Sequence, residues 1–507
     1  MTTRAAHIVF AATTLVGGCS IIYNPDNIPT KQDAAIIHPD ANPAGLMVTS
    51  VAPSTILEGQ GDGGSRPAII VIQGANFIAG ARVELMPSGA VSLVVDNSKV
   101  QISTDAHFLA VPVTAHVDQN LHENTNVALS VKVTQVSPTG PVISTLDAAQ
   151  SGLVLKGLDE LDLGHVLTDW SKLRPLYSQV DLKTKGTLDL DAGTRAARII
   201  VAVSSIEIDG ASATGDPGNG ANGGAGGAGG CQGGGGRVAG SCNGAGGGAP
   251  GAFLGGGGGG GAGFAAAGSA GTGAGGGGSA GIIVGDDAVA MYTGATANQA
   301  GGGGGGAGTA VMTNGGGGGG GGGLVELTAG GNVTVGAGGV NVNGGDGGSP
   351  PPVVGGGGGG GGAGGVIVVR AGNTLTTTML VSKGGMPGPS AGAGSSGRVR
   401  WDAASGAATG NPTPVRGVAF ASETPLVVMN ASDQLTWIGT PNHQFGISTL
   451  DGSGMTHTGS MATVGGAGMT SANVPWTPGL NHVCITLAGG MKGHAESDTC
   501  LDVAYLP

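Results

Sequence analysis

The sequence predicts an all-β chain in which two β-sandwiches flank a glycine-rich β-solenoid with polyglycine loops. Three observations lead to this fold class. Short runs of Val, Ile and Leu alternate with turn residues near both ends of the chain. Glycine makes up 111 of the 507 residues, and 79 of these glycines lie between residues 211 and 400. Similar apolar segments recur among these glycines, which is typical of stacked repeats.

The overall composition excludes several classes of protein. Charged residues are 10% and aromatic residues 3% of the chain, which is too few large side chains for one close-packed globule. The net charge of −12 provides no basic stripe for phosphates, so we expect no nucleic-acid partner. Glycine occurs in blocks rather than at every third position, which excludes collagen. No later stretch of about 18 apolar residues follows the N-terminus, so we expect no transmembrane helix.

The N-terminal residues predict export. Residues 1–18 combine Arg4 with an apolar run from Ile8 to Val16 and two small residues, the pattern of a secretory signal peptide. Residues 19–45 are polar and contain several prolines, so they predict a tether.

The end of the signal carries a more specific pattern. The segment Val16-Gly17-Gly18-Cys19 resembles the lipobox of bacterial lipoproteins. The resemblance implies that Cys19 becomes the acylated N-terminus and binds outer-membrane lipid, because Ser20 stands where the family's inner-membrane retention signal has Asp. Several acyl chains on one residue would hold the protein at the membrane almost permanently. Ordinary secretion, with Cys19 discarded or unpaired, is the alternative.

The remaining four cysteines form two close pairs, Cys231 with Cys242 and Cys484 with Cys500. An exported chain favours disulfides, so we predict both bridges. Metal ligation is the alternative, but no Cys-x-x-Cys spacing is present and no His lies near the first pair. We therefore expect no metal site at these residues.

Residues 46–155 predict a β-sandwich of short strands. The opening Val51-Ala52-Pro53-Ser54 and the segment Gly74-Ala75-Asn76-Phe77 resemble the IPT/TIG family of immunoglobulin-like domains. The resemblance implies a spacer or binding module with a turn at Gly74 and Asn76-Phe77. Residues 156–198 are expected to be a connector. The expected strands are Ala68–Ile72, Ala81–Leu85, Val91–Val95, Leu109–Val113 and Val127–Val133.

Residues 199–405 predict the β-solenoid. Each copy of the repeat reads as a short strand, a turn, a second strand, a Gly-Gly corner and a polyglycine excursion. Such a unit cannot bury its own apolar face, so copies must stack with Val, Ile and Leu inward. The copies are Ile199–Gly210, Leu324–Gly345 and Val366–Gly385, with a weaker one at Gly281–Val284.

The longest glycine runs are Gly255–Gly261, Gly301–Gly306, Gly315–Gly323 and Gly355–Gly362. Ordering Gly costs more backbone entropy than ordering any other residue. Two outcomes remain open. The runs are flexible hydrated loops, or they lie side by side as extended helices with hydrogen bonds between segments, because Gly permits close approach.

Residues 415–507 predict a second, smaller sandwich, in which Cys484 and Cys500 join the last two strands. This region resembles the disulfide-stapled immunoglobulin-like modules found at the ends of bacterial surface proteins. The expected strands are Leu426–Met429, Leu435–Ile438, Phe445–Ile447, Val483–Leu487 and Cys500–Tyr505.

Patterns that suggest chemistry are weak. Gly277–Gly281 matches the G-x-S-x-G nucleophile pattern but lacks the strand–helix context of that motif. His107, His116 and His122 fall within the first sandwich, where surface histidines are the simpler interpretation. Asp286-Asp287 reads as a solvated turn rather than a calcium or catalytic pair. We expect no catalytic residue and no cofactor.

The few ionisable strand residues of the repeats are Glu207, Glu326, Arg370 and Lys383. They fall at different places in their repeats, so we expect that they do not converge. A glycan-cleaving enzyme on a β-solenoid would need clustered acids on one face.

The sequence therefore predicts a non-catalytic, lipid-anchored cell-surface protein with a structural or adhesive role. Its partners would be outer-membrane lipid through Cys19, and an extracellular polysaccharide or a surface protein. The alternatives are a polysaccharide-binding module, which exposed Trp401, Trp437 or Trp476 would favour because sugars stack on rings, and a glycan-cleaving enzyme.

Overall fold

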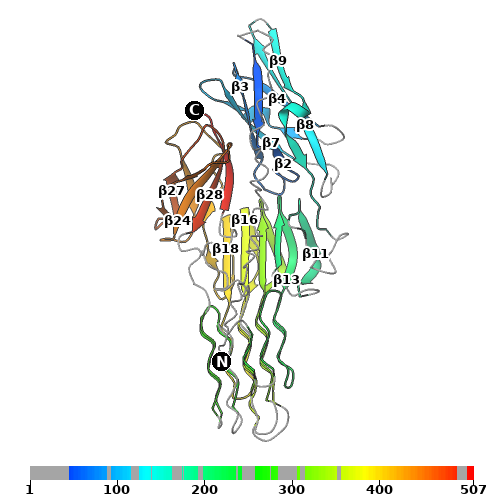
Figure 1. Ribbon diagram of the computed structural model, residues 1–507, viewed down its shortest axis with the longest axis vertical. Helices are drawn as coiled ribbons and strands as arrows, with labels where there is room; N and C mark the ends of the chain where they lie inside the picture. Colours follow the sequence, from blue (N-terminus) through cyan, green and yellow to red (C-terminus); the bar gives the residue numbers. More distant parts are fainter. Residues whose placement is uncertain are drawn as a thin grey trace, which may run out of the picture.

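The computed structural model is nearly all β and has three parts, an N-terminal sandwich, a central parallel sheet and a C-terminal unit (Figure 1). Its only helices in the described ranges are α1 (Ala148–Ser151) and the 3₁₀ turn Asn97–Lys99. No helix within those ranges has the length and hydrophobicity needed to cross a membrane. The structure describes residues 45–87, 93–115, 125–138, 140–162, 174, 176–191, 198–235, 238–241, 257–273, 276–283, 305–308, 315–350, 356–487 and 499–507.

The N-terminal sandwich consists of two sheets that enclose one apolar core, including Ile70, Val111 and Val131. Alternating residues of the long strand β8 (Asn126–Ser137) are buried, as expected for a strand with one face on a core. The first sheet contains β1 (Met47–Ala52), β3 (Ala68–Ala75), β5 (Val94–Val95), β6 (Gln101–Ile102) and β7 (Phe108–Thr114). The second contains β2 (Thr55–Leu57), β4 (Arg82–Pro87), β8, β9 (Gly140–Leu146) and β10 (Val154–Lys156).

The central sheet is built from parallel pairs only. Its strands form two ladders, which are joined because β16 (Val366–Thr377) and β18 (Arg398–Ala407) run through both. The first ladder contains β12 (Arg198–Ala202), β14 (Leu324–Ala329), the first parts of β16 and β18, and β20 (Val415–Arg416). The second contains β11 (Val180–Asp189), β13 (Ile206–Ser212), β15 (Val333–Asn341), the ends of β16 and β18, β17 (Leu380–Val381) and β19 (Gly410–Asn411).

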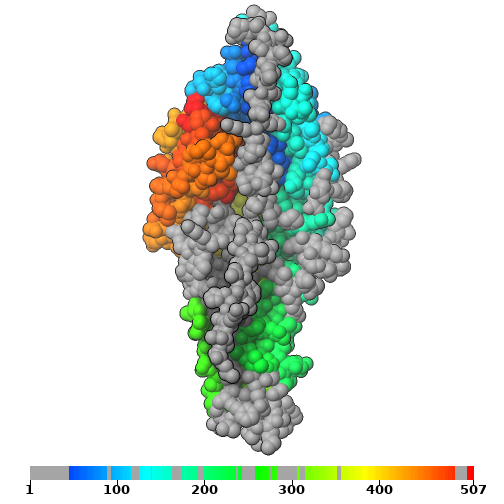
Figure 2. All heavy atoms as spheres, viewed as in Figure 1, coloured from blue at the N-terminus to red at the C-terminus, as the bar shows by residue number. Residues whose placement is uncertain are grey.

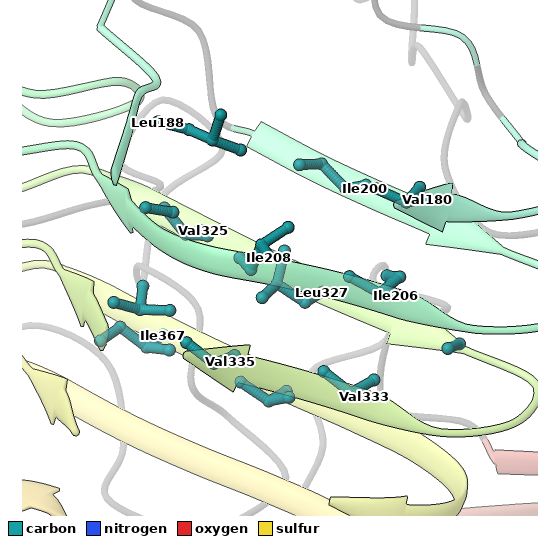
Figure 3. Close-up of a cluster of buried hydrophobic side chains, with 14 of the residues drawn as sticks. Val180, Leu188, Ile200, Ile206, Ile208, Val325, Leu327, Val333, Val335 and Ile367 are labelled. Carbon is teal, nitrogen blue, oxygen red and sulfur yellow. The ribbon is translucent and has the colours of Figure 1, made fainter. Parts of the chain in front are cut away.

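The core of the central sheet lies between the two ladders. Ile200, Val325 and Ile367 of the first ladder belong to one buried cluster with Ile208 and Val335 of the second. Figure 3 shows these side chains between the facing strands. The strands that the repeats predict are therefore present, and they stack in parallel with Val, Ile and Leu inward.

The C-terminal unit contains two further sheets around the buried rings of Phe420, Trp437 and Phe445. The Cys484–Cys500 disulfide is formed and joins β28 (Gly479–Leu487) to β29 (Thr499–Tyr505), as predicted. The small sheet contains β21 (Ala419–Phe420), β23 (Gln434–Ile438) and β27 (Met469–Asn473). The larger one contains β22 (Val427–Val428), β24 (Gln444–Asp451), β25 (Thr456–Thr458), β26 (Ala462–Thr463), β28 and β29.

The C-terminal unit also packs on the N-terminal sandwich (Figure 2). Ile69 and Val71 of β3 share an apolar cluster with Ala504 and Leu506. The Arg66 guanidinium donates to the carbonyl groups of Ala421 and Thr424 at 2.7 and 2.8 Å. The C-terminal unit and the N-terminal sandwich therefore share an interface of apolar and hydrogen-bonded contacts.

Two details differ from the sequence expectation. The segment expected to be a connector, 156–198, contains β11, which pairs with β13 at the edge of the second ladder. The weaker repeat at Gly281–Val284 forms no strand in its described residues, and Ile282 and Ile283 are 60% and 53% exposed. The alternation of apolar residues therefore did not show which of these two segments forms a strand.

Candidate functional site

Glycine-rich segments extend from one end of the central sheet and lie side by side (Figure 1). Backbone hydrogen bonds join them throughout their described residues. We call each segment a rod and the set the polyglycine bundle. The described rods are 213–220, 222–228, 230–235, 257–263, 268–273, 276–283, 305–308, 315–323, 343–350, 356–365, 382–388 and 389–397. The packed alternative for the glycine runs is therefore the one observed in these residues.

The rod 315–323 lies at the centre of the bundle. Successive amide groups of this rod donate to three different neighbouring rods, so each of these neighbours accepts from every third residue. The carbonyl groups accept from three other rods with the same period of three residues. A repeat of three residues is that of an extended left-handed helix. The acceptor rods are 213–220, 230–235 and 356–365, and the donor rods are 222–228, 305–308 and 343–350.

Six neighbours around one rod leave no room for side chains. A Cβ on Gly319 would lie less than 3.0 Å from the carbonyl oxygen of Gly345, and one on Gly360 would meet that of Gly260 in the same way. Real Cβ atoms essentially never approach backbone atoms so closely. Glycine is required here by the close approach of backbones, while left-handed φ angles occur at turns such as Gly220 and Gly276.

The rod 268–273 shows how the surface of the bundle is made. Gly268 and Gly271 face the neighbouring rod, because a Cβ on either would collide with its carbonyl groups. Ser269, Ala270 and Thr272 are exposed. In this rod, side chains therefore occur only at the positions of the triplet that face solvent, whereas small side chains such as Ala262, Ala307 and Ala363 are buried in other rods.

A cavity of about 530 Å³ lies where the three parts of the molecule meet. Its walls come from the loop before β3, the outer face of the first ladder, and strands β24, β28 and β29. This volume is within the usual range for small-molecule sites. The cavity is therefore a candidate site for a small molecule.

The floor of the cavity is a buried ionic network. Arg370 lies 3.3 Å from Glu326 and 3.4 Å from Asp402, and Arg400 binds both oxygens of Asp402 at 2.9 and 2.6 Å. These side chains are at most 12% exposed. Two arginines and two carboxylates balance one another, which is the condition under which charges are buried.

The expectation that the ionisable repeat residues stay apart is wrong for Glu326 and Arg370. Arg370 lies opposite Thr328 in the ladder, and Glu326 is two residues earlier on the same face. The two side chains therefore meet diagonally across adjacent strands. Glu207 instead pairs with Lys183 at 2.9 Å in the second ladder, and Lys383 is exposed.

One wall of the cavity carries a histidine–carboxylate pair beside the disulfide. His482 Nδ1 lies 2.7 Å from Asp502 Oδ1, and both residues line the cavity together with Cys484 and Cys500. On another wall, burial lowers the pKa of Arg66, while the charge of Glu423 opposes this shift. The cavity thus combines neutralised charges with one polar pair and a disulfide.

Comparisons with family models, curated proteins and solved structures found no match to this chain.

Several predicted residues lie outside the described residues, namely Cys19, Cys242, His116, His122 and Asp286-Asp287. Cys231 is 6% exposed and disulfide-bonded, and its pairing with Cys242 stays a prediction. Ser279 of the nucleophile-like pattern is exposed on the rod 276–283. His107 pairs with Asp105 at 3.2 Å on the surface of the sandwich.

The tryptophan rings considered as candidates for sugar stacking are not exposed to solvent. Trp437 is fully buried and Trp401 is 8% exposed, with the Arg416 guanidinium 4.7 Å from its ring centre. Trp476 is half-buried and donates to the carbonyl group of Asp433 at 2.9 Å. The exposed large apolar side chains of the described residues are aliphatic, with no aromatic ring among them.

Proposed function

We propose that this chain is a non-catalytic, lipid-anchored protein of the outer membrane and cell surface, with a structural or adhesive role. In this proposal the parallel ladders are the coils of a β-solenoid, and the flanking units are immunoglobulin-like modules. The observation that carries the proposal is the polyglycine bundle, whose backbone groups are hydrogen-bonded between rods and whose buried glycines leave no space for a side chain.

The bundle has the properties of a stiff extension. A rod of eight residues at about 3.1 Å per residue is about 25 Å long. Its interior amide and carbonyl groups are paired with neighbours. Its outer triplet positions carry small side chains such as Ser269, Ala270 and Thr272. Such a surface supports recognition by shape and backbone groups rather than by charge, which suits a surface protein or an extracellular polysaccharide as partner.

Attachment to the membrane is the second element of the proposal. Acylated Cys19 would insert into outer-membrane lipid, and the polar residues that follow would separate the folded parts from the bilayer. The sandwich that begins at β1 follows directly after the proposed tether in the sequence.

The two alternatives have less support. A hydrolase would need a carboxylate available as acid or base, but Glu326 and Asp402 are held by Arg370 and Arg400. A stacking site for sugars would need an exposed ring, but Trp401, Trp437 and Trp476 contribute to packing.

The test is expression with the native signal in a Gram-negative host, comparing wild type, Cys19→Ala and the neighbouring control Ser20→Ala. We expect wild type and Ser20→Ala in the outer membrane, cleaved by protease on intact cells, and Cys19→Ala in the soluble fraction. Cells that display wild type should also show increased attachment to surfaces or to other cells.

Soluble wild type would contradict the lipid anchor and would favour a secreted polysaccharide-binding protein. Anchored wild type that is protected from protease on intact cells would contradict surface display. A displayed protein that leaves attachment unchanged would contradict the adhesive role and leave the structural one.

A further inference from the structure

The disulfide of the C-terminal unit has a polar neighbour on the same face of the sheet. Cys484 lies opposite Cys500 in the β28–β29 ladder, and His482 lies opposite Asp502. Residues two apart on a strand point to the same side, so the four side chains share one face. A ring nitrogen of His482 and both sulfur atoms lie within 4.8 Å of one another.

This face is open to the cavity. Cys500 is exposed and Cys484 is half-buried, and both line the cavity of about 530 Å³. Cys231 is different, because it is buried at 6% exposure among the rods. A small molecule in the cavity can therefore reach the Cys500 sulfur.

The histidine is held in one orientation. An ionised Asp502 can only accept a hydrogen bond, so His482 Nδ1 carries the hydrogen of the 2.7 Å contact. The proton-exchanging nitrogen is then Nε2. An imidazole fixed in this way beside a disulfide can donate a proton to a sulfur that leaves as thiolate.

We propose that Cys484–Cys500 is a reactive disulfide that captures a small thiol by exchange, with His482 assisting the leaving sulfur. The thiolate of the incoming molecule attacks Cys500 Sγ and forms a new S–S bond. The Cys484–Cys500 bond breaks, and its electron pair leaves on Cys484 Sγ. Protonated His482 then gives its proton to this thiolate, so the incoming sulfur is oxidised to the disulfide level and Cys484 is reduced.

This inference goes beyond the proposed function and does not depend on it. It assigns to the protein a covalent site for low-molecular-weight thiols. A cavity of this size favours small or flexible thiols over a cysteine on the surface of a folded protein.

The experiment uses the folded full chain and glutathione as the probe. Wild type, His482→Gln and Asp502→Asn are incubated with glutathione at one pH, and the adducts are quenched and mapped by mass spectrometry. The matched control is His457→Gln, because His457 forms a similar 2.8 Å pair with Asp451 in the same sheet, on β24 and β25. A second arm replaces glutathione with a folded protein that carries one exposed cysteine.

We expect wild type to form a mixed disulfide on Cys500 under folded conditions, with Cys484 alkylated by N-ethylmaleimide. His482→Gln should slow the exchange at least about tenfold, as for loss of a proton donor, and Asp502→Asn should slow it less. His457→Gln should match wild type. The protein thiol should react much more slowly than glutathione.

Adducts that form only after addition of urea would overturn the proposal, as would adducts on Cys484 or equal rates in wild type and His482→Gln. If His482→Gln lowers the melting temperature, the site of the wild-type adduct and the rate of Asp502→Asn decide the question. A protein thiol that reacts as fast as glutathione would overturn the restriction to small thiols.

Discussion

The central sheet and the polyglycine bundle belong to the same repeats but are stabilised in opposite ways. In the sheet, backbone ladders hold strands whose Val, Ile and Leu side chains fill the space between two layers. In the bundle, backbone groups bind neighbouring rods, and most buried positions are Gly, with a few small side chains such as Ala262 and Ala363. The comparison shows that one chain can alternate between a core of side chains and a core of main chain within about 40 residues.

The two parts also differ in what opposes folding. Ordering glycine costs more backbone entropy than ordering other residues, and glycine buries no side chain in return. The bundle offsets this cost by pairing its buried amide and carbonyl groups, each of which would destabilise the fold by about 1–3 kcal/mol if left unsatisfied. The sheet instead gains from apolar burial of about 1.5–3 kcal/mol for each large side chain.

The largest loss of stability is expected when a methyl group is added to a buried glycine of the bundle. Gly360→Ala would place a Cβ against the Gly260 carbonyl, and the rods would have to separate. We expect a loss of stability of about 5 kcal/mol or more, because overpacking and several unsatisfied backbone groups act together. Hydrogen exchange of the rods and thermal unfolding measure this effect. Gly466→Ala is the control, because nothing lies within 4 Å of its Cβ; similar behaviour of the two variants would contradict the close packing.

A smaller effect is expected in the sheet. Leu327→Ala removes a fully buried side chain from between the ladders, and this should reduce stability by about 2–5 kcal/mol. Chemical denaturation measures the change, and hydrogen exchange should report faster exchange in β14 than in the rods. Met386→Ala, at a side chain that is 68% exposed, should have little effect. Equal loss of protection in rods and sheet would mean that the two parts unfold as one unit.

In the C-terminal unit, unlike in the bundle, a charged side chain contributes to stability. Burial opposes ionisation of Asp451, but hydrogen bonds from Ser453, His457 and the Met455 amide lower its pKa to about 2. This value is below the unfolded one, so the stabilisation is present above about pH 4 and is lost as the pH falls through 2. Asp451→Asn should therefore cost about 2 kcal/mol at neutral pH and almost nothing near pH 2. Denaturation at both pH values checks this, and a difference independent of pH would contradict the assignment.

The smallest effect is expected at the surface of the bundle. Ala270 occupies an exposed triplet position, so Ala270→Ser should change stability by no more than about 0.5 kcal/mol. Gly271→Ala, one residue later, should be strongly destabilising because its Cβ would meet the Gly258 carbonyl. Thermal unfolding of both variants measures the difference. Equal melting temperatures would contradict the assignment of position 271 to the buried side of the rod and position 270 to the exposed side.

Much of the central sheet was accessible from the sequence, because its strands repeat. The copies beginning at Ile199, Leu324 and Val366 became β12, β14 and the start of β16. The copy at β18 was missed, because its outward residues Arg398 and Arg400 are charged. They are buried only because other parts of the fold pack on that face. Burial of this kind cannot be predicted from the alternation of apolar and polar residues in the strand.

The site was less accessible than the fold. The pairing of Cys484 with Cys500 was predicted from their spacing and from the expectation that the chain is exported, and the disulfide is present. The meeting of Glu326 with Arg370 depends on the register of β14 against β16, which the unequal glycine loops conceal. The cavity needs residues from β3, β16 and β28 at once, so no single segment of sequence indicates it.

The contact between Pro507 and the N-terminal sandwich has a mechanical consequence. The Thr104 amide donates to a Pro507 oxygen at 3.0 Å, so the last described strand contacts the N-terminal sandwich. Tension applied between the polyglycine bundle and a chain held at its N-terminus then has at least three load paths. One follows the polypeptide from β10 into β11, and a second crosses the interface of Ala504 and Leu506 with β3. A third is direct, because the Asn332 amide of the central sheet donates to the Gly63 carbonyl group of the sandwich at 3.0 Å. Paths in parallel share the load, so the sandwich and the sheet resist separation together.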